Sequence, residues 1–502
     1  MSDHHPVLPG RPVSLWLDTT SETGFPALAE RMDVDVAVVG GGIAGLTAAT
    51  LLKAAGKTVA VVEAGRIAAG VTGHTTAKIT ALHTLIYDHL VRHFGEDKAR
   101  AYGEAQQAAI ELIAALVAER DIDCDFARTE AYTYTDSDEE VPAVEAEARV
   151  ALALGLPAAY VPDPPLPFPV KGAVRFDHQA RFHPRKYLLA LASDLPGKGC
   201  HIFEQTRVTE VAPGEPCTVV TDRGHLRARD VIVASHFPFA DKALFASRLQ
   251  PQRSYVLAVR LDGPAPPGMF IDTAEAFSLR SQPLPGGREL ALITGAGHPA
   301  GEGGDTTARY QRLEMLARSR LPVRSVEYRW STQDNFTLDR VPYIGRTTHH
   351  SRHLYVATGF NGWGMTGGTV AAMVLRDLIL GEDNPWAEVF DPSRLDLGSV
   401  PELVRHNVKV AAHFVADRVA GTDSDSIAPG EGKIVHGLHG NVALYRDDEG
   451  QVHRHSPVCT HMGCILRWNP AERSWDCPCH GSRFGYDGEV LHGPAVRPLD
   501  KR

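Results

Sequence analysis

The C-terminal end of the chain holds the side chains best suited to bind a metal centre. Four of the seven cysteines fall within 21 residues, in the patterns C-x-H-x2-C starting at Cys459 and C-x-C-H starting at Cys477. Two cysteines and two histidines bind either one zinc ion or a [2Fe–2S] cluster, in which one iron takes both thiolates and the other both imidazoles. Six candidate ligands in two matching loops favour the cluster over a zinc ribbon.

The two loops resemble those of the Rieske proteins of cytochrome bc-type complexes. The resemblance implies that the cluster ligands are Cys459, His461, Cys477 and His480. It also implies that a disulfide between Cys464 and Cys479 joins the loops, and that the hydroxyl of Ser482 bonds a cluster sulfur. The bc-type members carry a tyrosine where this chain has Phe484. Since hydrogen bonds to sulfur raise the reduction potential, the resemblance implies a lower potential here.

Short β-rich segments surround these loops. Three runs between glycine-rich turns predict strands of a small antiparallel domain: Lys433–His436, Asn441–Tyr445 and Val452–His455. Further histidines lack ligand spacing and are predicted to be solvated loop residues: His436, His439, His453, His455 and His492. The C-terminal region is therefore predicted to be a small all-β domain that carries one cluster.

Near the N-terminus, a strand–glycine–helix–strand pattern predicts a dinucleotide site. The apolar run Val34–Val39 leads into a G-x-G-x-x-G motif, then helix-forming residues, a second apolar run and Glu63. Gly40 permits a tight turn, Gly42 lets the backbone approach a pyrophosphate, and Gly45 allows close packing of helix on strand. The helix N-terminus offers N–H groups to phosphates, and Glu63 stands where an acid binds a ribose hydroxyl.

A second strand–glycine–helix unit lies far downstream, with G-x-G-x-x-G at Gly362, Gly364 and Gly367. One interpretation is a separate NAD(P) site. We disfavour it because the helix predicted over Val370–Leu380 is not followed by a second strand with a terminal acid.

Together these segments resemble the FAD-dependent D-amino-acid-oxidase-like family, which includes glycine and sarcosine oxidases, over roughly residues 33–385. The downstream matches are Asp339, Pro342, Ile344, Gly345, Ala357, Thr358, Gly359, Phe360, Gly364, Met365 and Thr366. In that family the first motif binds the ADP half of FAD. The downstream segment closes over the isoalloxazine, where the positive end of a helix near Thr366 would stabilise an anionic reduced flavin. The implied FAD contacts are Gly40, Gly42, Ala44, Gly45, Glu63, Ala64, Arg66, Thr72, His74, Val208, Gly359, Gly364, Met365 and Thr366.

His74 has a G-x-T-x-H context, with Gly70 and Thr72, that resembles the covalent flavin attachment site of dimethylglycine- and sarcosine-dehydrogenase-like members. The alternative is a histidine that hydrogen-bonds within the loop without a covalent link. Both interpretations stay open at this point. The candidates to face the flavin are His74, Lys78, Tyr255 and Trp330, and none is assigned a catalytic role.

Composition narrows the classes of partner. The 51 Lys+Arg and 61 Asp+Glu leave a net charge of −10, which argues against nucleic acid because phosphate binding needs a basic surface. The apolar stretches are strand-length, and none reaches the ~18 residues of a membrane span. The N-terminal sequence lacks a positive region followed by an apolar run, so we expect no secretory signal and a cytoplasmic location.

We expect the chain to divide into four parts. Residues 1–31 form a leader that packs on the flavin domain through Trp16, 32–400 the FAD-dependent oxidoreductase domain, 401–420 a linker helix, and 421–502 the Rieske domain. The fold class is an α/β FAD-binding Rossmann-like domain with an inserted mixed-sheet substrate domain, plus a small all-β C-terminal domain. Residues 80–160 are rich in Ala and Glu and predicted mostly helical.

A flavin that accepts two electrons and a cluster that carries one suggest a converter between the two kinds of chemistry. The leading hypothesis is an amine or amino-acid dehydrogenase that passes electrons through the cluster to an external one-electron acceptor. The family supplies this small-molecule substrate class only by analogy. Two alternatives stay open: reversed flow, in which the cluster feeds a flavin reductase, and a non-enzymatic redox sensor or electron-transfer module.

Overall fold

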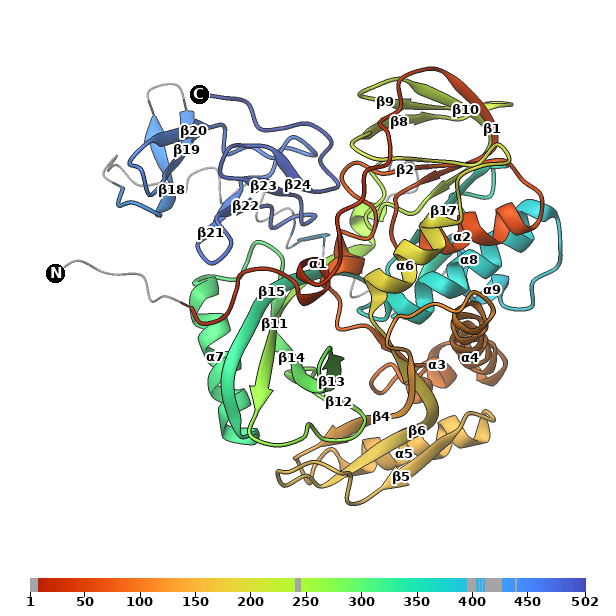
Figure 1. The fold of residues 1–502 in the computed structure, drawn as a ribbon, viewed down its shortest axis with the longest axis vertical. Helices are drawn as coiled ribbons and strands as arrows, with labels where there is room; N and C mark the ends of the chain where they lie inside the picture. The colour runs from red at the N-terminus through yellow and green to blue at the C-terminus, as the bar shows by residue number, and fades with distance from the viewer. Residues whose placement is uncertain are drawn as a thin grey trace.

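The computed structural model describes residues 8–239, 245–394, 403–405, 407, 408, 410, 427–437 and 440–502. Figure 1 shows one sheet flanked by helices, a second large sheet below it, and the C-terminal strands beside that second sheet. The first sheet has eight strands. Six of them follow the order β16 (Tyr343–Arg346), β17 (Leu354–Thr358), β10 (His225–Val233), β1 (Met32–Val39), β2 (Val59–Val62) and β7 (His201–Phe203). The hairpin of β8 (Val208–Ala212) and β9 (Cys217–Thr221) extends from β10.

Parallel pairing brings the ends of β1 and β2 to one edge of this sheet, where the glycine motif begins. Gly40 has φ +111°, and a Cβ added to it would lie 2.5 Å from the carbonyl oxygen of Ala234. A Cβ on Gly45 would lie 2.0 Å from the carbonyl oxygen of Gly40. Only glycine fits at either position, so α2 (Ile43–Ala54) starts directly against the strand end.

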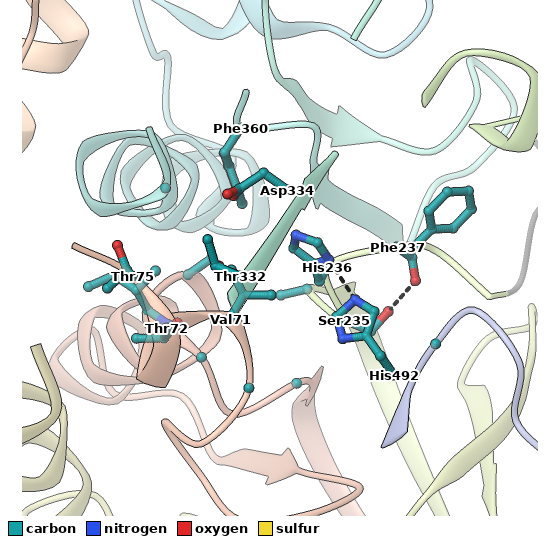
Figure 2. A pocket seen from close by; sticks show the side chains of 18 of the residues that line it. Val71, Thr72, Thr75, Ser235, His236, Phe237, Thr332, Asp334, Phe360 and His492 are labelled. Atoms are coloured by element: carbon teal, nitrogen blue, oxygen red, sulfur yellow. Dashed lines mark hydrogen bonds between the residues drawn. The ribbon is translucent and has the colours of Figure 1, made fainter. Parts of the chain in front are cut away.

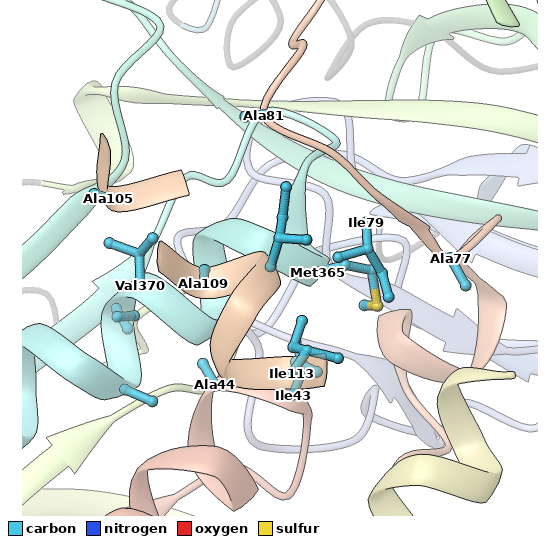
Figure 3. Close-up of a cluster of buried hydrophobic side chains, with 14 of the residues drawn as sticks. Ile43, Ala44, Ala77, Ile79, Ala81, Ala105, Ala109, Ile113, Met365 and Val370 are labelled. Atoms are coloured by element: carbon cyan, nitrogen blue, oxygen red, sulfur yellow. The ribbon is translucent and has the colours of Figure 1, made fainter. Parts of the chain in front are cut away.

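Helix α8 (Gly364–Leu380) packs against both α2 and α4 (Glu96–Glu119). Figure 3 shows side chains from all three in one buried cluster, among them Ile43, Ile113 and Val370. The helix predicted to begin at Val370 begins at Gly364. Its glycines, which lower helix propensity, permit close packing: a Cβ on Gly368 would lie 2.8 Å from Cγ2 of Ile43.

The second sheet has nine strands. It is mixed, as predicted for the inserted substrate domain. Its order is β15 (Val323–Thr337), β11 (Leu249–Leu261), β14 (Arg288–Pro299), β13 (Phe277–Leu284), β12 (Met269–Asp272), β4 (Ala127–Thr135), β6 (Gly172–Arg181) and β3 (Lys78–Ile79), with β5 (Ala158–Val161) beside β6. Strand β4 lies within the region predicted mostly helical. Its second half alternates Tyr and Thr, which favour strands, and it pairs with β6 and β12, so the overall Ala and Glu content of the region concealed a local strand signal.

The remaining helices cover the sheets and connect them. They are α1 (Leu15–Asp18), α3 (Tyr87–Phe94), α5 (Val141–Ala153), α6 (Pro184–Ser193), α7 (Thr306–Arg320) and α9 (Ala387–Phe390). Trp16 in α1 is fully buried and donates its indole N–H to the carbonyl oxygen of Thr75 at 2.6 Å. Within the described ranges, none of the helices combines the length and the apolar character that a membrane span requires.

The C-terminal region forms two small antiparallel sheets. One has β18 (Gly432–Gly437), β19 (Gly440–Arg446) and β20 (Val452–His455), which match the three predicted strands. The other has β21 (Arg467–Asn469), β22 (Ser474–Asp476), β23 (Arg483–Gly485) and β24 (Val490–His492). Of the helix expected over Glu402–Val419, residues 403–405, 407, 408 and 410 are helical. The rest of it, and the domain boundary expected at 421, lie outside the described residues.

Candidate functional site

A cavity of about 470 Å³ lies where the two large sheets meet the C-terminal region. Its dinucleotide-motif side includes Val39, Gly40, Gly41, Gly42, Ile43, Ala44, Glu63, Ala64, Arg66, Thr72, Arg207 and Val208. Its other side is formed largely by the nine-stranded second sheet, called the substrate sheet below. This substrate-sheet side includes Lys78, Ser254, Ile271, Glu275, Ser278, Thr294, Thr332, Asp334 and Phe336. Residues 490–496 of the C-terminal region line the same cavity.

Glu63 holds the glycine loop in place. Its two carboxylate oxygens accept hydrogen bonds from the backbone N–H of Gly41 and of Gly65, each at 2.8 Å. Burial raises the pKa of Glu63 against the lowering effect of these two N–H groups. Thr72 Oγ1 accepts from the N–H of Ile43 at 3.2 Å, so the loop after β2 is tied to the start of α2.

Most of the implied FAD contacts line the cavity: Gly40, Gly42, Ala44, Glu63, Ala64, Arg66, Thr72, Val208, Gly364 and Met365. Four are not among the lining residues: Gly45, His74, Gly359 and Thr366. Gly45 packs against the backbone of Gly40, and Gly359 packs against the side chain of Thr337. The Thr366 hydroxyl donates to the carbonyl oxygen of Thr80 at 3.1 Å.

His74 lies outside the cavity lining, with its Nδ1 hydrogen-bonded to the carbonyl oxygen of Gly70 at 2.8 Å. This arrangement matches the non-covalent interpretation of the loop. Of the other candidates to face the flavin, Lys78 lines the cavity, but Tyr255 and Trp330 do not. The Tyr255 hydroxyl bonds His298 at 2.9 Å, and the Trp330 indole donates to the carbonyl oxygen of His74 at 2.7 Å.

Side chains at the end of β15 alternate between the cavity and the C-terminal loops, because successive side chains of a strand point to opposite faces. Thr332, Asp334 and Phe336 line the cavity. From the opposite face, the Gln333 amide donates to the carbonyl oxygen of Gly481 at 2.9 Å. The Asn335 amide bonds His236 at 3.2 Å. No motif marks these residues in the sequence.

The cysteine and histidine loops come together as two matching halves. Cys459 and Cys477 are buried and their thiols are hydrogen-bonded to each other, and the ring centroids of His461 and His480 lie 5.1 Å apart. Cys464 and Cys479 form a disulfide with a Cα–Cα distance of 6.5 Å. The Ser482 hydroxyl is hydrogen-bonded to the thiol of Cys459.

The loop after β10 connects the cavity to the two histidine loops. Phe237 lines the cavity and is 2% exposed, and its ring centroid lies 6.3 Å from that of His461 and 6.1 Å from that of His480. Figure 2 shows the Phe237 ring turned away from Thr72 and Thr75, on the side where His492 enters. A single buried aromatic side chain therefore spans from the cavity wall to both histidine rings.

The prediction that His492 is a solvated loop residue is wrong. Instead of being solvated, it lines the cavity, and its Nε2 is hydrogen-bonded to Nδ1 of His236 at 3.2 Å (Figure 2). Burial lowers the pKa of both rings, that of His236 to about 4, so both are neutral. His455, also predicted to be solvated, is buried at the end of β20.

A buried charge network joins the substrate sheet to the C-terminal region. The Arg253 guanidinium, 1% exposed, lies 3.5 Å from a carboxylate oxygen of Glu472 and 3.8 Å from one of Asp476. Arg483 pairs with the same two carboxylates. Burial alone would raise the pKa of Asp476, but Arg483 and Arg253 outweigh it and hold that pKa far below its usual range.

Comparisons with known proteins agree with this architecture. The profile of the family described as FAD dependent oxidoreductase matches residues 35–378, and that of the Rieske [2Fe-2S] domain matches residues 418–501. The chain is 39% identical over 493 residues to a Bacillus subtilis protein whose name describes it as the Rieske 2Fe-2S iron-sulfur protein YhfW. This match covers 97% of each chain. The chain is therefore a member of the FAD dependent oxidoreductase family that carries a C-terminal Rieske domain.

Two further similar proteins match the flavin part of the chain. Gamma-glutamylputrescine oxidoreductase of Escherichia coli is 26% identical over 380 residues, which span 73% of this chain and 87% of that protein. The crystal structure of glycine oxidase from Geobacillus kaustophilus has a TM-score of 0.61 at 18% identity, covering 72% of this chain and 99% of that one. The protein is thus an oxidoreductase with the fold of glycine oxidase.

The residues present fit the two cofactors that these families use, FAD and one [2Fe–2S] cluster. The glycine motif leaves a cradle without side chains at the start of α2, and the cavity runs from Glu63 and Val208 to the substrate sheet. In the C-terminal region, two buried thiols and two imidazoles face one another, which is the donor set of a Rieske centre.

Proposed function

We propose that this enzyme oxidises an amine or an amino acid and passes the electrons singly through the Rieske cluster to an external one-electron acceptor. When bound, FAD takes two electrons from a substrate C–H bond and the cluster carries one electron at a time. The proposal includes the cytoplasmic location expected from the sequence. It also keeps the four-part division of the chain at residues 31, 400 and 420.

The observation that carries the proposal is the position of Phe237. Phe237 belongs to the cavity lining, and its ring centroid lies 6.3 Å from that of His461 and 6.1 Å from that of His480. A cluster domain without a redox role toward the flavin would have no need to present its histidine loops to the flavin cavity. The neighbouring bond between His236 and His492 closes the same wall.

For the cluster we propose Cys459, His461, Cys477 and His480 as ligands. The sulfur atoms of Cys464, Cys477 and Cys479 also lie within 4.8 Å of one another, as in a metal site. Cys464 and Cys479 are joined in a disulfide and are not thiolates, so these three residues do not form a set of metal ligands. Ser482, through its hydroxyl on Cys459, would raise the cluster potential.

For FAD we propose the implied contacts that line the cavity, with Gly40, Gly42 and the start of α2 at the pyrophosphate and Glu63 at the ribose. The start of α8 at Gly364 turns backbone N–H groups toward the cavity, where a partial positive charge stabilises an anion. The substrate sheet closes the opposite side and limits access of water to the reacting atoms.

The test is an anaerobic reduction of the full chain with both cofactors bound. A panel of primary and secondary amines and amino acids is added while flavin absorbance and the EPR signal of the reduced cluster are followed. We expect one class of compound to bleach the flavin, with the cluster signal appearing afterwards. A bleached flavin without a cluster signal would contradict the coupling. If no compound bleaches the flavin but the reduced cluster passes electrons to it, the flow is reversed.

Two glycines of one loop provide a matched control for the docking of the cluster. Gly301 has φ +71°, and a Cβ on it would lie 2.5 Å from the backbone nitrogen of Pro478. Gly304 has φ +61° and open space around it. Both Gly301→Ala and Gly304→Ala carry the same backbone cost, roughly 1 kcal/mol, but only the first displaces the loop of Cys477. We expect only Gly301→Ala to slow the appearance of the cluster signal after flavin reduction.

A further inference from the structure

The substrate-sheet side of the cavity contains carboxylates without a cationic partner. Asp334 lines the cavity from β15, and no Lys or Arg of the described ranges forms an ion pair with it. No donor there hydrogen-bonds its carboxylate either, whereas Asp339, five residues on, is paired with Arg394 at 2.7 Å. A second carboxylate, that of the solvent-exposed Glu275, lines the mouth of the same space and accepts the hydroxyl of Thr84 at 2.8 Å.

The surroundings of Asp334 disfavour its charged form. Burial, followed by the charge of Glu275, raises the pKa of Asp334 to about 6. Two residues earlier on the same face, Thr332 is 9% exposed and its hydroxyl has no hydrogen-bond partner. Figure 2 shows both side chains among those that surround the cavity. Buried polar groups are normally satisfied, so the unpartnered hydroxyl of Thr332, beside the half-buried carboxylate of Asp334, indicates a wall that a polar ligand covers.

The positive groups of the cavity do not offset these carboxylates. Among the lining residues the arginines are Arg66 and Arg207, which lie beside the dinucleotide residues Glu63 and Val208. Lys78 is the cation on the substrate-sheet side, and its ammonium already donates to the carbonyl oxygen of Phe270 at 2.9 Å and to the Ser278 hydroxyl. Burial, followed by Arg280, lowers the pKa of Lys78 to about 7, so it is a weak partner for a carboxylate.

We propose that this side of the cavity binds its substrate as a cation, with the Asp334 carboxylate accepting hydrogen bonds from a protonated amine, and that it disfavours a substrate whose recognised group is a carboxylate. This inference rests on the proposed function and narrows its substrate class from amines or amino acids to amines. An ammonium group supplies what the site lacks: a positive charge and donors beside Asp334 and Glu275, with the Thr332 hydroxyl as a further acceptor.

The experiment is a binding titration of the FAD-loaded full chain under anaerobic conditions at pH 8, where Asp334 is ionised. The probes are n-butylamine, glycine and sodium butanoate, and the readout is the saturable perturbation of the flavin absorbance spectrum, which does not depend on turnover. We expect n-butylamine to bind at least tenfold more tightly than butanoate or glycine. Asp334→Asn keeps the shape and removes the charge, and should weaken n-butylamine binding about tenfold or more, whereas Asp334→Glu restores most of it.

Thr332→Val serves as the matched control on the same face, because it removes a hydroxyl without removing charge and should change the affinity only a few-fold. Binding of butanoate or glycine more tightly than n-butylamine overturns the inference. So does an Asp334→Asn variant whose affinity for n-butylamine stays within twofold of the wild type, or a wild type that binds none of the probes. If n-butylamine binds and bleaches the flavin but the cluster is never reduced, only the proposed coupling fails. If glycine or another amino acid, and no amine, binds and reduces the cluster, only this inference fails.

Discussion

At the scale of single residues, one aromatic side chain connects two cofactor sites that lie far apart in sequence. Phe237 is neither a ligand nor part of a motif, yet its ring contacts His461 and His480 from a position in the cavity wall. It is placed there by the turn after β10, where the Ser235 hydroxyl donates to the carbonyl oxygen of Phe237 at 3.1 Å.

The first residue-scale prediction concerns this ring. Phe237→Leu should slow the reduction of the cluster that follows flavin reduction, because the aliphatic side chain no longer fills the space between the cavity and the imidazoles. The lost packing should also cost about 1–3 kcal/mol of stability. Stopped-flow absorbance with freeze-quench EPR measures the rate, and Phe237→Tyr, which keeps the ring, is the control. Equal rates in all three proteins would remove Phe237 from the path.

A second prediction at this scale concerns flavin attachment. Because His74 points its Nδ1 at the carbonyl oxygen of Gly70 and is not part of the cavity lining, we expect FAD to be held without a covalent bond. Acid precipitation should release all yellow colour into the supernatant, and His74→Ala should retain the FAD content of the wild type. Flavin that stays in the washed pellet of the wild type but not of the variant would establish the covalent link instead.

At the scale of elements, long-range contacts set the ends of helices. The N-terminus of α3 is capped from another helix: the Glu147 carboxylate on α5 accepts the N–H groups of Tyr87 at 2.8 Å and of Asp88 at 2.9 Å. Burial raises the pKa of Glu147 from 4.5 to about 7 despite these bonds. The helix end is thus satisfied by a side chain that sequence spacing within α3 does not reveal.

The corresponding prediction is a pH dependence of stability. Because the folded-state pKa of Glu147 is raised, its contribution is fully present below pH 4.5 and is lost as the pH rises toward 7. Over this window the slope amounts to at most about 1.4 kcal/mol per pH unit. Glu147→Gln, which does not titrate, should show a smaller drop of Tm between pH 5 and pH 7.5 in calorimetry. If the drop of Tm between the two pH values is the same in the wild type and the variant, Glu147 keeps its ordinary pKa.

At the scale of the whole molecule, the C-terminal domain is held against the substrate sheet by buried polar contacts. Beside the Arg253 network, the Thr306 hydroxyl donates to the side-chain oxygen of Asn469 at 2.7 Å, and the Tyr310 hydroxyl donates to Glu472 at 3.2 Å. The cluster domain therefore has a defined docked position, next to the sheet whose other face lines the cavity (Figure 1).

Arg253→Met should weaken this docking strongly. It leaves two buried carboxylates with Arg483 alone, and breaking a buried pair in this way costs roughly 3–5 kcal/mol. Arg260→Met, on the same strand, breaks a half-exposed ion pair with Glu327 of 3.4 Å and should cost about 0–1 kcal/mol. Small-angle scattering should show a larger radius of gyration for the first variant only. An identical scattering profile for both variants would exclude Arg253 as a docking residue.

Sequence alone determined the chemistry that depends on local spacing. The glycine motif and the two cysteine–histidine loops are short segments whose function follows from residue types at fixed offsets, and their families and cofactors could be predicted from them. The three strands of the first C-terminal sheet could also be predicted, because their alternation is local. The strand β4 was missed although its alternating Tyr and Thr favour a strand, because the composition of the surrounding region is that of helices.

Only the tertiary structure decided where these local units meet. His492 was expected in solvent and instead closes the cavity wall with His236. Tyr255 and Trp330 were candidates to face the flavin but lie outside the cavity lining, where they are hydrogen-bonded to His298 and to the carbonyl oxygen of His74. Asp334 carries no signal in the sequence, because its meaning depends on the absence of a cationic partner in three dimensions. The physical reason is the same in each case: burial and charge pairing arise from contacts between distant segments, which residue spacing does not encode.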